Sequence, residues 1–374
     1  PWSWGENIAW TGTTSQIDLL DAIDRHHAGL FRSPGHRENI LDGGFREIGV
    51  GQERGSFTSA GTTYDASMLT ENFASSGTPY FLTGVAYDDL DDDGFYSAGE
   101  GIGGVEFLID NTASDTLAAG GYAVTIPSGG PGEVTITRGG TSFELRLDLP
   151  DSNVKLDLVG PDGIRSSASV TVLPHGTGQL GEIGLLGPWD LNATGGDASE
   201  RIIGNTGANI LRGNGGDDAL LGGNGRDTIY GDDGEDHLDG GPLGDVLWGG
   251  ADNDVLLGRG GWDVLGGADG DDEIWAGDHG DTVYAGQGHD LIGGGDGDDE
   301  VWAGAGGDTI YAGDGADTIG AGPGWDQIWG GAGPDLVFGY DGQDRIGGSW
   351  GADRLYGGDD DDVIFGGQGA DHVG

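Results

Sequence analysis

The sequence predicts a protein of several domains that ends in a parallel β-roll, and three observations support this. An aspartate occupies every ninth position from Asp218 to Asp371, and an aliphatic residue follows two positions after each one. Between residues 80 and 177, apolar and polar residues alternate in short runs bounded by Gly and Pro, as in half-buried strands. A length of 374 residues is also too great for one ordinary core.

The first 79 residues mix helix and strand patterns. Apolar residues recur at helical spacing from Ile17 to Phe31. Ser33 followed by Pro34 is a favourable start for a second helix. Alternation over residues 48–50 then predicts a strand. We expect a partial α/β domain over residues 1–79.

Three motifs lie in this segment: Gly5-Glu6-Asn7-Ile8-Ala9, Ser33-Pro34-Gly35-His36-Arg37-Glu38-Asn39-Ile40-Leu41 and Phe45-Arg46-Glu47-Ile48-Gly49-Val50-Gly51. In content and order they resemble the bacterial branch of the CAP superfamily (cysteine-rich secretory, antigen 5 and pathogenesis-related proteins). The resemblance implies an α/β/α sandwich with a His/Glu cavity, in which Glu6 and His36 occupy cavity positions. It also implies that residues 70–74 form a core strand. The family's first helix would precede Pro1, and Glu71 stands where the family has Gln.

The CAP resemblance implies extracellular binding of a lipid or a surface partner. An alternative is a secreted hydrolase that uses Glu6 and His36. The sequence contains no Cys and no G-x-S-x-G nucleophile motif, so we favour binding over catalysis.

Residues 80–177 are expected to form a β-sandwich, with strands over 105–109, 133–137 and 143–147. At its start, residues 89–100 match the twelve-residue calcium loop D-x-[DN]-x-[DN]-G-x5-E. Strand-like flanks argue against an EF-hand. Residues 84–87 and 103–105 resemble B-type repeat domains of bacterial surface proteins, which carry such loops. The expected calcium ligands are Asp89, Asp91, Asp93, the carbonyl of Phe95, and Glu100.

After a linker over residues 178–195, residues 196–374 repeat the pattern G-G-x-G-x-D-x-U-x, where U is aliphatic. The glycines permit a tight turn, and x-U-x predicts a three-residue strand whose central side chain points inward. Two repeats make one coil of two strands and two turns. Turns on the same edge are therefore eighteen residues apart in sequence and about 4.8 Å apart in space.

Aspartates stacked at this spacing repel each other by about 3 kcal/mol per pair at an effective dielectric constant near 20. The repeat therefore requires cations between the coils, and calcium accepts six to eight oxygens in flexible geometry. The expected ligands of several calcium ions are Asp218, Asp227, Asp236, Asp245, Asp254, Asp263, Asp272, Asp281, Asp290, Asp299, Asp308, Asp317, Asp326, Asp335, Asp344, Asp353, Asp362 and Asp371.

This pattern resembles the hemolysin-type, or RTX, calcium-binding repeat over about half of the chain. The resemblance implies a secreted, extracellular protein that a type I system exports unfolded and that folds outside the cell in calcium. We favour a role of the β-roll in folding and export over a binding activity of the roll itself.

A second period of 27 residues places aromatic residues three positions after the aspartates, as at Trp275, Trp302 and Trp329. These side chains should face outward on both sheets. We favour packing across neighbouring strands. The alternative is a surface that holds glycan, peptide or another roll, as in an extracellular matrix or adhesion protein.

Composition narrows the class of protein further. The formal net charge of −50 repels phosphate backbones, so nucleic acid is not an expected partner. The absence of Cys excludes disulfides and cysteine-bound zinc. No apolar run is long enough for a transmembrane helix. The chain opens without a signal peptide and closes within a repeat, so both ends are expected to be cuts in a longer protein.

Overall fold

The computed structural model describes residues 3–13, 47–59, 62–75, 80–90, 96, 100–117, 120–126 and 129–374. The chain divides into two compact units, Pro1–Tyr80 and Phe81–Gly374. Each unit is described here by itself. In the described residues, no helix has the length and apolar character needed to cross a membrane.

The first unit contains a three-stranded antiparallel sheet of β1 (Ser3–Thr13), β2 (Glu47–Ser59) and β3 (Thr62–Ser75). β3 lies in the centre, and Glu6 of β1 pairs with Asn72 of β3. The strands predicted over residues 48–50 and 70–74 are thereby confirmed. The helices predicted between residues 17 and 41 lie outside the described residues, as does His36. The α/β/α arrangement therefore stays a prediction.

The second unit begins with two sheets that share one core. Phe107 and Tyr122 come from opposite sheets, and their rings stack with centroids 3.7 Å apart. The Tyr122 hydroxyl donates a hydrogen bond of 2.6 Å to the carbonyl of Leu156. The strands predicted over 105–109, 133–137 and 143–147 correspond to β5, β8 and β9. The full set is β4 (Tyr80–Tyr87), β5 (Glu106–Ile109), β6 (Thr112–Asp115), β7 (Gly121–Ile126), β8 (Gly130–Arg138), β9 (Thr141–Leu149), β10 (Val154–Val159), β11 (Gly163–Ser166) and β12 (Val170–Val172).

The same two sheets continue into the stretch expected as a linker. Residues 178–195 contain β13 (Glu182–Leu185) and β14 (Asn192–Thr194). β13 pairs in parallel with β11, and β14 pairs in parallel with β12. The linker expectation is corrected accordingly, because these strands already belong to the stack of coils and precede the first aspartate of the repeat.

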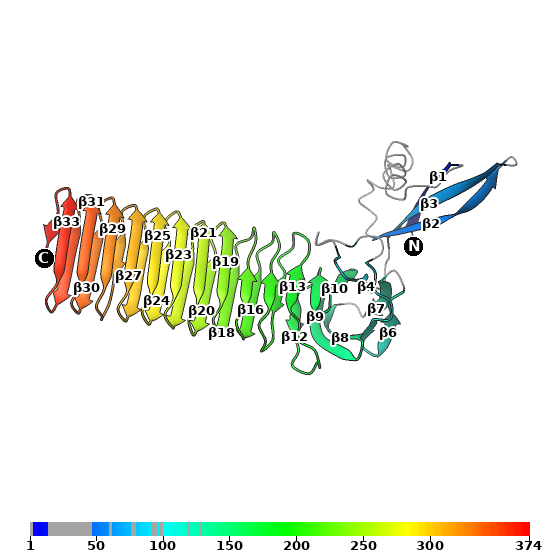
Figure 1. The fold of residues 1–374 in the computed structure, drawn as a ribbon, viewed down its shortest axis with the longest axis horizontal. Coiled ribbons are helices and arrows are strands. Elements are labelled where there is room, and N and C mark those ends of the chain that lie inside the picture. Colours follow the sequence, from blue (N-terminus) through cyan, green and yellow to red (C-terminus); the bar gives the residue numbers. More distant parts are fainter. Residues whose placement is uncertain are drawn as a thin grey trace. The chain divides into compact units, whose positions relative to one another are not determined.

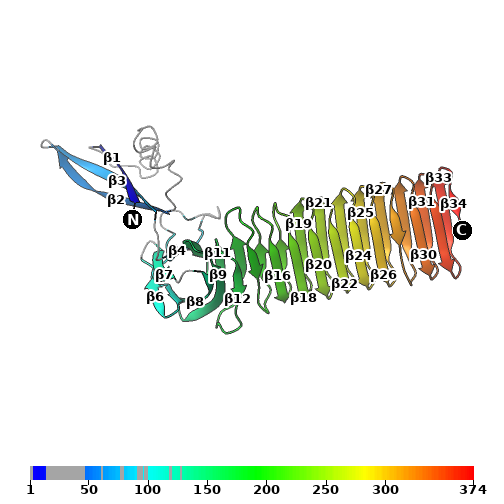
Figure 2. The same cartoon turned by 180° about the vertical axis from the view of Figure 1, so that it is seen from behind.

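The predicted parallel β-roll is confirmed, with partner residues eighteen positions apart, as at Leu211 and Ile229. Figures 1 and 2 show its strands side by side in two facing sheets. The strands are β15 (Arg201–Ile203), β16 (Ile210–Gly215), β17 (Ala219–Leu221), β18 (Thr228–Asp233), β19 (His237–Pro242), β20 (Val246–Ala251), β21 (Val255–Gly260), β22 (Val264–Asp269), β23 (Glu273–Asp278), β24 (Thr282–Gln287), β25 (Leu291–Asp296), β26 (Glu300–Ala305), β27 (Thr309–Asp314), β28 (Thr318–Gly320), β29 (Gln327–Ala332), β30 (Leu336–Asp341), β31 (Arg345–Trp350), β32 (Arg354–Asp359), β33 (Val363–Gln368) and β34 (His372–Val373).

Most strands of the roll are six residues long, which corrects the predicted length of three. Each has a second inward position two residues after the aliphatic one. This position holds Gly or Ala, such as Gly231 or Ala276, and Ala276 is fully buried. The roll interior is therefore built from two rows per sheet, one of large aliphatic side chains and one of very small residues.

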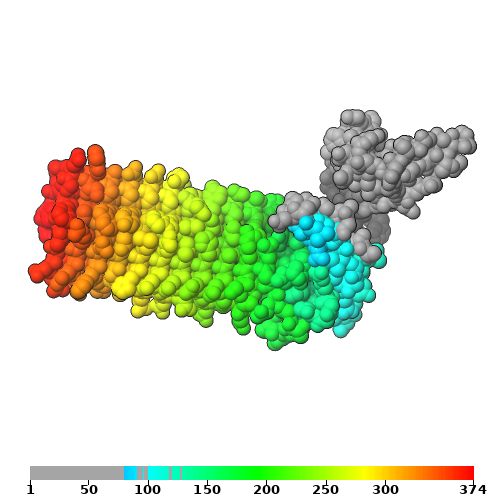
Figure 3. All heavy atoms as spheres, viewed as in Figure 1, coloured from blue at the N-terminus to red at the C-terminus, as the bar shows by residue number. Residues whose placement is uncertain are grey.

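One continuous row of apolar side chains joins the first strands of the second unit to the roll. Leu158 lies opposite both Ala86 and Ile164. Ile164 pairs with Ile183, which pairs with Ile202, and steps of eighteen residues then carry the row to residue 364. In the space-filling view, the coils of this unit close against one another without a break (Figure 3). The whole of the second unit thus has a single elongated core.

Candidate metal centre: two aspartate ladders

The turns of the roll hold one left-handed backbone position before every repeat aspartate, and a second before most of them. Before Asp290, Gly286 has φ of 126° and Gly288 has φ of 142°. The position four residues before the aspartate has a positive φ in all eighteen turns, even where Arg259 or Tyr340 occupies it. A turn that imposes this conformation on side-chain-bearing residues is held by its neighbours in the stack.

The repeat aspartates form two ladders, one along each edge of the roll. The first ladder runs from Asp218 in steps of eighteen residues to Asp362 and precedes strands of the fifteen-stranded sheet. The second runs from Asp227 to Asp371 and precedes strands of the sixteen-stranded sheet. From Asp218 to Asp353, these side chains are at most 3 % exposed. They lie inside the turns and not on the surface.

One carboxylate oxygen of each aspartate binds the backbone of the preceding coil. The Asp272 N–H donates to Oδ1 of Asp290 at 2.9 Å, and the Asp290 N–H donates to Oδ1 of Asp308 at 2.9 Å. The same bond recurs along both ladders, from Asp218 to Asp371. A backbone amide therefore satisfies one oxygen of each carboxylate, which the sequence pattern did not indicate.

The second oxygen, Oδ2, is buried and receives no hydrogen bond in the part of the chain that the structure describes. This is so for sixteen aspartates, at every ninth position from Asp218 to Asp353. A carbonyl oxygen of the next coil lies beside it. A Cβ added to Gly222 would lie 2.6 Å from Oδ2 of Asp227 and 2.6 Å from the carbonyl oxygen of Gly240. Two oxygens converge there with no donor between them, and a cation would satisfy both.

Burial raises the pKa values of the ladder carboxyls from Asp218 to Asp344. Burial is the main cause at Asp254, with the neighbouring carboxylates of Asp236 and Asp272 adding to it, and the pKa reaches about 8. The pKa of Asp236 is raised to about 7 by the same causes. The backbone N–H bond acts in the opposite direction at both residues. A buried carboxyl in this position therefore needs either a proton or a metal ion at Oδ2.

The donor set fits calcium. The described residues contain no group of three or more His, Cys, Asp or Glu side chains arranged to hold a metal ion. An ion in a ladder would therefore take few carboxylates and several backbone carbonyls, which are all hard oxygen ligands. The residues that would hold it are an aspartate, through Oδ2, and the Gly or Ala five residues before the next aspartate of the same ladder. Once bound, calcium would supply positive charge between the coils.

Sequence reasoning missed these carbonyl ligands. The signal was present in the Gly or Ala that stands five residues before every aspartate, because only a small residue leaves Oδ2 access to the neighbouring carbonyl. Reasoning also missed the residues that start the ladders. Glu200 and Asn209 stand eighteen residues before Asp218 and Asp227, and each donates its backbone N–H to the aspartate Oδ1.

Of the predicted calcium loop, residues 89–100, the structure describes both ends and Tyr96. Asp88 N–H donates to the Glu100 carbonyl at 3.0 Å, and Leu90 N–H donates to Glu100 Oε1 at 3.0 Å. The two ends of the loop therefore meet, and Glu100 is buried between them. Asp91, Asp93 and Phe95 lie outside the described residues, so the ligand set stays a prediction, like the cavity role of Glu6 and His36.

The aromatic side chains of the 27-residue period pack against the glycine of the next coil in the same sheet. A Cβ on Gly320 would lie 2.5 Å from the Trp302 ring. Tyr311 and Trp329 stack instead on each other, with ring centroids 4.8 Å apart and an interplanar angle of 9°. These contacts give the stripes a packing role across neighbouring coils.

Comparison with known families supports the metal assignment of the ladders. The sequence matches the family described as RTX calcium-binding nonapeptide repeat (4 copies) over residues 194–229, 216–242, 239–274, 260–292, 293–324, 320–355 and 348–373. Both ladders lie within these matches. A search of curated proteins finds no match to the chain.

Proposed function

We propose, for a chain that carries RTX calcium-binding repeats, that calcium ions fill both aspartate ladders and that this binding folds the roll of a secreted, extracellular protein. The observation that supports this most strongly is the row of sixteen buried Oδ2 atoms without a hydrogen bond. Beside nine of them, Asp227 included, lies a backbone carbonyl oxygen of the next coil. An ionised carboxylate in such a place is costly without a cation, and a divalent ion compensates two neighbouring coils at once.

Calcium supply would then decide where the protein folds. Without metal, the ionised aspartates of neighbouring coils repel one another and the roll is unstable. The chain is therefore suited to export in the unfolded form. Outside the cell, millimolar calcium fills the ladders and the coils close. Type I export is part of this proposal and follows from the RTX repeats.

The two segments before the roll would add binding functions to this calcium-dependent core. The loop from Asp89 to Glu100 would hold a separate calcium ion. The CAP-like segment, through a cavity with Glu6 and His36, would bind a lipid, glycan or surface protein. These roles rest on sequence motifs.

Circular dichroism of the full chain tests the proposal. The β-sheet spectrum should be strong in 5 mM CaCl2 and should weaken greatly in excess chelator, with recovery when calcium is restored. Magnesium at the same concentration is the control and should restore much less, because Mg²⁺ demands strict octahedral geometry and gives up water reluctantly. An unchanged spectrum in chelator would contradict calcium-driven folding.

A further inference from the structure

The two ladders end differently at the side of the roll nearest the N-terminus. Glu200 occupies the ladder position before Asp218, and Asn209 occupies the one before Asp227. The nine-residue aspartate pattern includes neither residue. One end of the stack therefore carries a longer acidic side chain, and the other carries a neutral amide.

Glu200 shares one feature with the repeat aspartates, a carboxylate oxygen beside a carbonyl of the next coil, but here that oxygen also accepts a backbone hydrogen bond. A Cβ added to Gly195 would lie 2.7 Å from Glu200 Oε2 and 2.7 Å from the carbonyl oxygen of Gly213. This is the same pairing of acid and next-coil carbonyl that surrounds Gly222. The Glu200 side chain is 4 % exposed, and the Gly196 N–H donates to Oε2 at 3.1 Å. In the described part of the chain, Oε1 receives no hydrogen bond.

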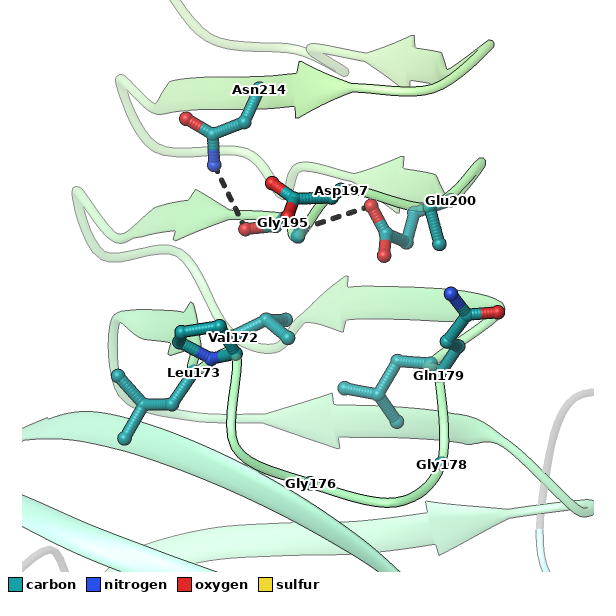
Figure 4. A pocket seen from close by; sticks show the side chains of 13 residues that line it. Val172, Leu173, Gly176, Gly178, Gln179, Gly195, Asp197, Glu200 and Asn214 are labelled. Atoms are coloured by element: carbon teal, nitrogen blue, oxygen red, sulfur yellow. Dashed lines mark hydrogen bonds between the residues drawn. The ribbon is translucent and has the colours of Figure 1, made fainter.

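The space beyond Glu200 is a cavity of about 450 Å³ and not another repeat turn. The loop after β12 forms its far wall, with Val172, Leu173 and Gln179 opposite Glu200 and Asn214 (Figure 4). In Figure 4 the oxygen of Glu200 that makes no hydrogen bond points into this gap. Asn214 donates from Nδ2 to the carbonyl of Gly195 at 2.9 Å, which fixes the wall next to the carboxylate.

Asn209, at the end of the second ladder, has hydrogen bonds to both polar atoms of its side chain. Its Nδ2 donates to the carbonyl of Leu191 at 2.7 Å and to Oδ1 of Asn205 at 3.1 Å. Its Oδ1 accepts the Asn205 N–H at 2.8 Å. Asn209 Oδ1 also lies beside a carbonyl of the next coil, since a Cβ added to Gly204 would lie 2.5 Å from Oδ1 and 2.1 Å from the carbonyl oxygen of Gly222. The side chain is neutral, however, and its second polar atom is a donor that already has two acceptors.

We propose that Glu200, together with the carbonyl oxygen of Gly213, binds a terminal divalent cation that closes the first ladder, whereas Asn209 closes the second ladder by hydrogen bonds alone. Beside this terminal ion, the cavity leaves room for water or for an oxygen of an external ligand, which ions inside the ladders would not have. The proposal rests on calcium binding by the ladders.

Native mass spectrometry of the full chain in calcium tests it, because each bound ion adds a resolvable mass. Glu200→Gln keeps the acceptor for the Gly196 N–H but removes the charge. We expect it to bind one ion fewer than the unmodified chain. Glu182→Gln is the matched control, since Glu182 already pairs with Arg165 and Arg201, and it should keep the full count. An equal count for Glu200→Gln and the unmodified chain would overturn the terminal site while leaving the ladders intact.

Hydrogen exchange gives a second readout that does not depend on the absolute count. Calcium should protect the amides of residues 195–200 in the unmodified chain, and Glu200→Gln should lose that protection while residues 222–227 keep theirs. Retained protection at 195–200 in the variant would also overturn the proposal. Absence of any calcium binding by the unmodified chain would refute the ladders themselves, so the two failures are distinct.

Discussion

Each repeat aspartate contacts both neighbouring coils, with one carboxylate oxygen toward each. Oδ1 accepts a backbone N–H from the preceding coil, and Oδ2 faces a carbonyl of the following one. The first contact needs only an oxygen, whereas the second needs a cation or a proton between two oxygens. Replacement by Asn separates the two requirements, because an amide keeps Oδ1 and places a donor at the position of Oδ2.

Asp227→Asn should therefore change stability in opposite directions with and without calcium. In chelator the amide can donate to the Gly240 carbonyl, and the roll should gain about 1–3 kcal/mol of unfolding free energy. In calcium the variant lacks one anionic ligand and should lose a similar amount. Urea unfolding in both conditions measures this. Asp298→Asn is the control, because Asp298 is exposed and accepts the Ala316 N–H outside the ladders. For Asp227→Asn, a change of the same sign in both conditions would contradict the two-oxygen account.

The raised pKa values predict that acid can replace calcium in part. An unfolded aspartate titrates near 3.9, whereas folding raises the pKa values of most ladder carboxyls, to about 6 at Asp218 and about 8 at Asp254. The folded state thus binds more protons, so metal-free stability is fully present below the unfolded pKa and is lost as pH rises from about 4 to about 8. In chelator, circular dichroism should show more β-structure at pH 5 than at pH 8. Equal spectra would contradict burial of the carboxyls.

The same raised pKa values predict proton release on metal binding. In a pH-stat at pH 6, added calcium should displace protons from the ladder carboxyls.

At the scale of the element, the turn sets the distance between coils. Gly286 has a positive φ, and a Cβ there would clash with the Ala268 carbonyl of the preceding coil. Gly286→Val should cost about 1–3 kcal/mol from backbone strain alone, and should raise the calcium concentration at the folding midpoint. Ala285→Gly, in the same turn, should cost under about 1 kcal/mol, because it removes one methyl group. Equal midpoints for the two variants would reject the strain argument.

The aromatic stripes permit a similar comparison between strands. Gly320→Ala places a methyl group against the Trp302 ring and should displace it into solvent, with a red shift of tryptophan fluorescence. Gly347→Ala should leave the spectrum unchanged, because the nearest atom to its Cβ, in Trp329, would be 3.5 Å away, an ordinary contact. Identical spectra for all three proteins would show that the ring does not depend on the glycine beneath it.

Local periodicity explains which elements the sequence could predict. Strand positions, the eighteen-residue step and the inward aliphatic residues follow from the nine-residue period. The strand length of six residues does not follow from the period. The small residues after each aliphatic residue resemble a turn, yet their backbone continues the hydrogen bonds of the sheet. β13 and β14 were also missed, since the register from Ile164 to Ile183 and Ile202 uses steps of nineteen residues outside the period. The carbonyl ligands depend on contacts between coils, which no single repeat contains.

At the scale of the whole molecule, a formal net charge of −50 is large, but only the buried part of it requires bound ions. Exposed carboxylates are screened by salt within about 10 Å at 0.1 M, whereas buried ones are screened much less. Sodium chloride at 0.5 M should therefore leave the metal-free chain expanded, and 5 mM calcium should contract it. Small-angle X-ray scattering measures the radius of gyration in both. Contraction by sodium chloride to the calcium value would show that general charge repulsion, and not the ladders, controls folding.

The eighteen-residue register also determines how such a protein can change in length. Duplication of eighteen residues adds one coil, about 4.8 Å of rod, and leaves every later strand in its sheet and every later aspartate on its edge. Duplication of nine residues moves all later strands to the opposite sheet and exchanges the two edges. The first ladder would then contain the aspartates of the second beyond the point of insertion, and each aromatic stripe would cross to the other face. Insertion of an even number of repeats therefore preserves the residues on both faces and both edges of the roll. Insertion of an odd number exchanges the two faces and the two edges beyond the insertion.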